Sequence, residues 1–185
     1  MSTRVARADL TESRPRTPRV NRSVGSAAGL LALSLVVYSV AGAVWGALRP
    51  TFGAEVSTDG ALLLHDADNA QFTSFITFAL ITGLLGLGGA LFAYFRFRGE
   101  RGMGMLLWVA AVAFLAAVSF WAVGEVVADR LHPVPEPSEL ELGDELRVVP
   151  SLVPGVAAGA APALASLGYW LAAVLDFLAP EPAEE

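Results

Sequence analysis

The sequence predicts an all-α membrane protein, a four-transmembrane-helix bundle with a small extracytoplasmic β-hairpin cap. The first observation is composition: the 185 residues are 55% hydrophobic and only 16% charged, with a mean hydropathy of +0.57. Soluble globular domains carry more charge than this. The second observation is that four long stretches contain no charged residue, and the third is that two connections between them carry strand and turn signals.

The charge-free stretches cover residues 23–48, 69–95, 102–124 and 148–175, which are 26, 27, 23 and 28 residues long. A helix needs about 20 apolar residues to cross a bilayer, and a helix satisfies its own backbone hydrogen bonds there. The first stretch exceeds the ~7 to 15 apolar residues of a signal peptide, so we expect it to be retained. Residues 24–178 therefore form the predicted transmembrane domain.

The arginines predict the orientation, because positively charged flanks stay on the cytoplasmic side. Six arginines precede the first span and three lie in residues 96–101, whereas only Arg49, Arg130 and Arg147 lie in the other two connections. We therefore expect both termini in the cytoplasm and outer loops at about residues 49–68 and 125–147. These loops contain eleven of the eighteen acids and three arginines, a net charge of −8, against +2 from nine arginines and seven acids inside.

The two ends of the chain have compositions that do not favour folding. Residues 1–23 contain six arginines, two prolines and few apolar residues, which predicts a disordered basic cytoplasmic tail. Residues 179–185 are Ala-Pro-Glu-Pro-Ala-Glu-Glu, which predicts a short acidic cytoplasmic tail.

Both outer loops contain strand signals. Asp59-Gly60 separates two strand-compatible segments, and Asp-Gly favours the tight turn of a β-hairpin. Apolar and charged residues alternate around Gly143-Asp144 in the second loop, so one or two further strands that pair with the first hairpin are expected there. Two hairpins pairing with each other would form a small acidic cap.

Small residues four apart permit close helix packing in lipid. Such pairs occur in every span: Gly42 and Gly46, Ala79 and Gly83, Gly86 and Ala90, Ala113 and Ala117, Gly155 and Gly159. Most such spacing serves internal packing, and we retain Gly42, Gly46, Gly155 and Gly159 as candidate partner contacts. Pro162 lies inside the fourth stretch, which predicts a kink.

The sequence predicts no catalytic residue and no cofactor. It has no cysteine and no nucleophile-elbow, phosphate-loop or zinc-protease motif. The spans lack the ionisable residues that proton-coupled transport needs, and Glu125 and Asp176 at span ends are expected to reach interfacial water. A metal site is a weak alternative, since carboxylates and imidazoles of the outer loops could bind zinc or manganese: His65, Asp66, Asp68, Glu125, Asp129 and His132.

The order of several short features resembles a known family. These features are Trp45 to Pro50, the Asp59-Gly60 loop, a Gly-rich span after Phe72, the Arg96 to Gly102 connection, and Pro150 to Tyr169. Over about residues 24–178 the chain resembles an uncharacterised family of actinobacterial integral membrane proteins, domain of unknown function 2567. The resemblance implies the cytoplasmic (inner) membrane of a bacterium, and it implies no catalytic residues.

The leading interpretation is a non-enzymatic accessory subunit of a bacterial membrane protein complex. It would bind other membrane proteins, or itself, through helix faces and the acidic outer cap, with Glu139, Glu141, Asp144 and Glu145 as candidate contacts. The net charge of −6 excludes a broad nucleic-acid-binding surface. Two alternatives stay open, a small oligomeric transporter or channel component and a metal-dependent envelope enzyme.

Overall fold

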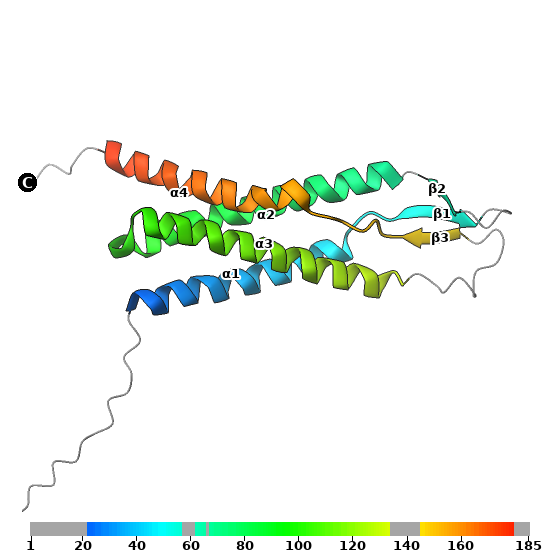
Figure 1. The fold of residues 1–185 in the computed structure, drawn as a ribbon, viewed down its shortest axis with the longest axis horizontal. Coiled ribbons are helices and arrows are strands. Elements are labelled where there is room, and N and C mark those ends of the chain that lie inside the picture. The colour runs from blue at the N-terminus through cyan, green and yellow to red at the C-terminus, as the bar shows by residue number, and fades with distance from the viewer. Residues whose placement is uncertain (1–21, 57–61, 66, 134–144, 180–185) are drawn as a thin grey trace, which may run out of the picture.

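The computed structural model describes residues 22–56, 62–65, 67–133 and 145–179, with four long helices packed along one another (Figure 1). The helices are α1 (Arg22–Ala47), α2 (Ala67–Arg96), α3 (Met103–Leu131) and α4 (Ala160–Leu178). A short 3-10 helix, η3 (Gly155–Gly159), leads into α4. In the described part of the chain four helices are long and apolar enough to cross a membrane, in agreement with the four predicted stretches.

The bundle consists of two closely packed helix pairs. Helix α1 packs mainly on α3, and α2 packs mainly on α4, while α3 also contacts α4 and α1 makes few contacts with α2. Helix α1 begins, and α4 ends, beside the short connection η1 (Arg98–Glu100), and we call this the tail end (Figure 1). The strands lie beyond the opposite end, which we call the sheet end.

Aromatic rings fill the core near the sheet end. Trp45 of α1, Phe78 of α2 and Phe120 of α3 have ring centroids 5.3 to 5.9 Å apart. Large apolar side chains such as Val36 and Val40 instead lie exposed on the outside of α1. Apolar surface outside and close packing inside are what a bundle needs when lipid tails surround it.

Two glycines of α1 serve the contact with α3. A Cβ on Gly42 would collide with the backbone of Phe120, and a Cβ on Gly46 would collide with the backbone of Gly124. The interpretation of Gly42 and Gly46 as partner contacts is therefore wrong, because the bundle itself occupies this face. Gly155 and Gly159 have open space around their Cβ positions and stay candidates.

Pro162 does not interrupt the interior of a helix, as the sequence had suggested. It is the third residue of α4, and α4 follows directly after η3. The first turn of a helix has backbone N–H groups without intrahelical acceptors, so a proline costs no hydrogen bond there. The predicted kink is therefore replaced by a change from a 3-10 to an α-helix before the proline.

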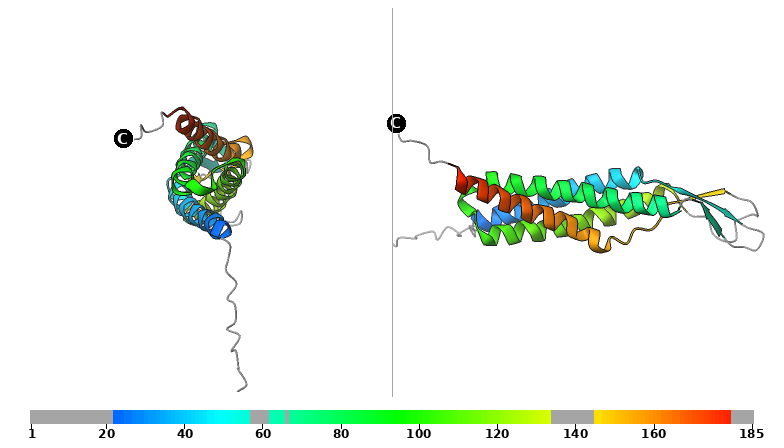
Figure 2. Two further views of the ribbon diagram at one scale, coloured as in Figure 1. Left: turned by 90° about the vertical axis from the view of Figure 1, so that its left-hand side faces the viewer. Right: turned by 90° about the horizontal axis from the view of Figure 1, so that it is seen from above.

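The strands form one three-stranded antiparallel sheet that projects away from the bundle at the sheet end (Figures 1 and 2). The strands are β1 (Phe52–Val56), β2 (Leu62–His65) and β3 (Glu145–Val148), in the order β2-β1-β3. Gly53 is opposite His65 on one side and Arg147 on the other.

The prediction of a cap built from two hairpins is not supported. The strands have only four or five residues, and among the described residues the second loop supplies one strand, which pairs with β1 rather than with a strand of its own loop. Other predictions lie outside the described residues. These are the Asp59-Gly60 turn, the contacts of Glu139, Glu141 and Asp144, and all but the edges of the two tails.

Candidate functional site at the sheet end

Arg49 is the most unexpected residue of the bundle. Sequence reasoning assigned it to an outer loop, but only 4% of the residue is exposed. Helix α1 ends at Ala47, and Pro50 prevents its continuation, so Arg49 follows the last helical turn directly. Its position brings a guanidinium group to the ends of α1 and α3.

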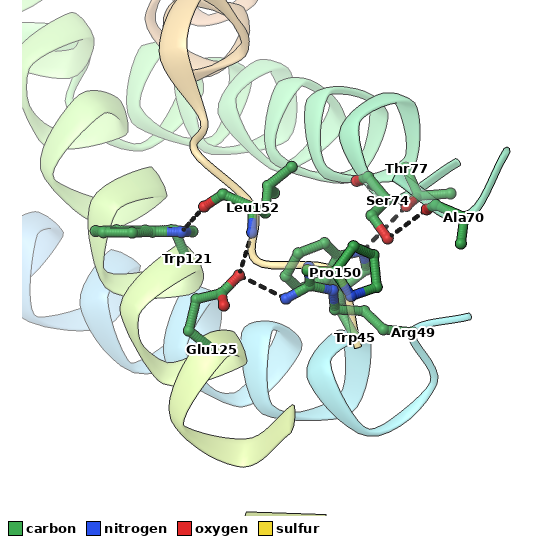
Figure 3. Close-up of polar contacts among 9 residues, drawn as sticks. All are labelled: Trp45, Arg49, Ala70, Ser74, Thr77, Trp121, Glu125, Pro150 and Leu152. Carbon is green, nitrogen blue, oxygen red and sulfur yellow. Dashed lines mark hydrogen bonds and ion pairs between the residues drawn. The ribbon is translucent and has the colours of Figure 1, made fainter. Parts of the chain in front are cut away.

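The guanidinium group of Arg49 has three neighbours (Figure 3). Nη1 donates to Oε1 of Glu125 at 2.5 Å, and Nη2 donates to the carbonyl oxygen of Pro150. The group also lies 4.8 Å from the ring centroid of Trp45, within the range of a cation–π contact. The side chain of Arg49 is fully buried, and that of Glu125 is 20% exposed.

The same carboxylate holds the segment that leads into α4. We call residues 149–154, between β3 and η3, the connector. Oε1 of Glu125 accepts from the backbone N–H of Leu152 at 3.3 Å, and the indole Nε1 of Trp121 donates to the Leu152 carbonyl at 2.8 Å (Figure 3). Two side chains of α3 and one from the end of α1 therefore attach the connector to the bundle.

Helix α2 joins this cluster through hydroxyl groups. The indole Nε1 of Trp45 donates to Oγ1 of Thr77 at 3.1 Å (Figure 3). That hydroxyl donates to the carbonyl of Thr73 at 2.7 Å. Ser74 donates to the carbonyl of Ala70 at 2.9 Å. We refer to Trp45, Arg49, Trp121, Glu125 and the connector as the Arg49–Glu125 cluster.

The polar groups of the Arg49–Glu125 cluster hold segments of the chain together. Oε1 of Glu125 accepts from both the Arg49 guanidinium and the Leu152 backbone N–H, so the carboxylate links the end of α1 to the connector. Glu125 was expected to reach interfacial water, and its side chain is 20% exposed while it is paired with Arg49. The sequence did contain a signal for this pair. Arg49 and Glu125 lie at the ends of two predicted spans, and both ends were assigned to the same side of the membrane.

The metal alternative finds little support in the described part of the chain. Glu125 is turned to Arg49, and no three His, Asp or Glu residues among those described form a group that could hold a metal ion. Asp129 lies on α3, and His132 follows the end of that helix. The side chains of His65, Asp66 and Asp68 lie outside the description.

A second arginine–carboxylate pair lies at the tail end. Nη1 of Arg101 donates to Oδ2 of Asp176 at 2.6 Å, and the Tyr94 hydroxyl donates to the same oxygen at 3.1 Å. The guanidinium lies 3.9 Å from the Tyr94 ring centroid, and Nε donates to the Tyr94 carbonyl. The two charged side chains are 24% and 56% exposed, so Asp176 does reach the surface as expected, but with a partner.

Hydroxyl groups inside the bundle form hydrogen bonds both within and between helices. Ser74 and Thr82 donate to carbonyls of their own helix, which needs no partner helix. Tyr38 of α1 donates instead to the Thr82 carbonyl of α2 at 3.1 Å, and Ser39 and Ser119 join α1 to α3 at 2.7 Å. Sequence reasoning missed these bonds between helices because the residue spacing does not specify which helices are neighbours.

Comparison with models of known protein families, with curated proteins and with solved structures finds no significant match to this chain, so its function must be argued from its own residues.

Proposed function

We propose that the chain is a non-enzymatic accessory subunit of a bacterial membrane protein complex. In this proposal it crosses the cytoplasmic membrane four times, with the tail end in the cytoplasm and the sheet end outside. The arginines support the orientation, because nine of the twelve belong to the tail end and its flanks. The resemblance to an actinobacterial family of unknown function suits a bacterial inner membrane and is part of the proposal.

The observation that carries the proposal is the pairing of β1 with β3. Four residues of the first loop are opposite four residues of the second, from Phe52 opposite Val148 to Glu55 opposite Glu145. Two segments about ninety residues apart in the chain thereby become one surface, and the Arg49–Glu125 cluster fixes the bases of both. The two loops together carry a net charge of −8, which suits a positively charged extracytoplasmic partner.

The internal use of polar groups supports a binding role over a catalytic one. In the described residues both Nη atoms of the buried Arg49 have acceptors, as do the buried Ser74 and Thr82, and only Nε of Arg49 and Nδ1 of His132 are buried without a partner. The outer faces are apolar, and Gly155 and Gly159 leave room for a neighbouring helix beside η3. A partner can therefore contact both the sheet end and this part of the bundle.

The test of the partner surface is purification of the tagged full-length protein from its own cells in mild detergent. The wild-type protein is expected to retain stoichiometric partners. A variant with lysine at positions 139, 141, 144 and 145 is expected to lose at least one of these partners. Membrane insertion should persist, because long outer loops tolerate charge. The matched control changes Glu181, Glu184 and Glu185 to lysine in the opposite, cytoplasmic tail.

The possible outcomes separate the functions. Retention of every partner by the four-lysine variant would remove the acidic loop from the proposal. Recovery of a pure homo-oligomer without any stoichiometric partner would favour the small transporter or channel instead. Bound zinc or manganese lost on changing His65 and His132 to alanine would favour a metal-dependent enzyme.

The orientation has its own test, cysteine labelling in intact cells. A single cysteine at Ser57 should react with a membrane-impermeant maleimide, and one at Gly99 should react only after the membrane is opened. Gly99 suits this purpose because it is exposed and its Cβ position meets no atom within 4 Å. The reverse labelling pattern would show that the sheet end is cytoplasmic.

A further inference from the structure

A crevice of about 360 Å³ lies at the tail end between α3 and α4. Its apolar wall includes Met103, Leu106, Trp170 and Ala173, and its polar part includes Arg101 and Tyr169. This volume is within the range of small-ligand sites in proteins, ~300 to 1,000 Å³. The crevice therefore combines an apolar slot with a cation at one end.

Arg101 is held in place but is not fully occupied. Its Nε donates to the Tyr94 carbonyl, and its guanidinium stacks on the Tyr94 ring, which fixes the direction of the side chain. Nη1 binds Asp176, whose side chain is 56% exposed, and Nη2 has no acceptor within the described part of the chain. An exposed carboxylate is a partner that another anion can replace.

The location of the crevice indicates which kind of anion would bind Arg101. Residues 97–102 join two membrane-spanning helices, so Arg101 lies where a span ends and headgroups begin. Met103 is 71% exposed and Trp170 is 55% exposed beside the crevice, and tryptophan is enriched at this depth of a bilayer. Basic pockets between membrane helices are known to bind anionic lipid headgroups.

We propose that this crevice binds one anionic phospholipid. Its phosphate contacts the guanidinium of Arg101 in exchange for Asp176, and an acyl chain lies against Leu106 and Trp170. The connection adds two further cations, Arg96 and Arg98, which attract the headgroup, whereas Glu100 and Asp176 oppose it. The inference depends on the bundle crossing a bilayer and not on the proposed protein partner or on which end is cytoplasmic.

The test is lipid binding to the full-length protein in detergent, measured by native mass spectrometry. Phosphatidylglycerol and phosphatidylcholine with identical acyl chains are the two probes. Wild type is expected to prefer phosphatidylglycerol, and Arg101→Gln is expected to weaken its binding about fivefold, the contribution of one arginine at a charged membrane surface. Inorganic phosphate in excess should not displace the lipid, because the acyl chain supplies part of the binding.

Three variants show whether Arg101 acts at the crevice. Arg98→Gln is the matched control, because Arg98 is exposed on the same connection and does not line the crevice, so it should lower binding much less than Arg101→Gln does. Asp176→Asn should strengthen binding, since it removes the competing carboxylate, and a purely structural role for the pair would not produce this gain. Ala173→Phe should block the lipid while leaving Arg101 intact, which keeps the test decisive if Arg101→Gln fails to fold.

Two results would overturn the proposal. Equal binding of both lipids by wild type would mean that only non-specific lipids surround the bundle. Equal losses in Arg101→Gln and Arg98→Gln would mean that general charge attraction, rather than this crevice, holds the lipid.

Discussion

The two ends of the bundle each hold one arginine–carboxylate pair beside an aromatic ring, yet the surroundings of the pairs differ. At the sheet end the Arg49 side chain is fully buried and Glu125 is 20% exposed. At the tail end the exposed fractions of Arg101 and Asp176 are 24% and 56%. The same two chemical groups therefore act in a largely dry environment at one end and in contact with solvent or headgroups at the other.

The glycines of α1 also differ between the two ends of the bundle. Gly42 and Gly46, toward the sheet end, lie against the backbone of α3, whereas Gly25 and Gly29, toward the tail end, meet no atom within 4 Å of a Cβ. The comparison indicates that the sheet end is fixed by close packing and buried charge. The exposed pair at the tail end is the one at which we propose that a lipid replaces a protein contact.

The largest expected effect comes from breaking the buried pair. Glu125→Leu leaves the Arg49 charge buried without a counter-charge, and such changes cost about 3 to 5 kcal/mol. Denaturant titration of the purified protein in detergent should detect this loss of stability. Changing Arg49 to methionine as well removes the unpaired charge, so the double variant should be more stable than Glu125→Leu alone. Equal stability of the two would show that the pair is not desolvated as described.

A smaller effect is expected from filling the close contact of α1 with α3. Gly46→Ala forces its new Cβ against the Gly124 backbone, and overpacking of this kind costs about 1 to 3 kcal/mol. Gly29→Ala on the same helix is the control, because open space and the higher helix propensity of alanine predict unchanged or slightly increased stability. The same unfolding assay compares them, and equal effects would contradict the difference between the two ends.

Attachment of the connector can be tested through one hydrogen bond. Trp121→Phe keeps an aromatic ring but removes the donor to the Leu152 carbonyl, with an expected cost of about 1 kcal/mol. Hydrogen exchange of residues 149–154 should become faster. In the control Trp170→Phe, the lost indole N–H has no acceptor in the described part of the chain, so exchange in the connector should not change.

The smallest effect is expected at the exposed pair. Asp176→Asn should change the free energy of unfolding by less than about 1 kcal/mol, because exposed ion pairs contribute little. Raising the salt concentration should reduce even this difference, since exposed charges are screened. A cost comparable with that of Glu125→Leu would place both pairs in the same class and remove the contrast between the ends.

Sequence reasoning predicted the spans and failed at the residues next to them. Charge-free stretches are sufficient to identify membrane helices, because the cost of an unpaired charge in lipid applies to each segment separately. Arg49 was assigned to an outer loop for the same reason, since a charge at a span end normally reaches water. Its burial depends on Glu125, 76 residues away, and on the Pro150 carbonyl, 101 residues away.

The sequence by itself therefore determined the number of spans, their approximate limits and the strand-forming character of the loops. Only the tertiary structure decided that Gly42 and Gly46 face α3, that β1 rather than β2 pairs with β3, and that each described arginine–carboxylate pair joins a connection to a distant helix. The physical reason is the range of the interactions. Hydropathy and turn preference act within a segment, whereas close approach, strand pairing and charge pairing depend on which segments become neighbours.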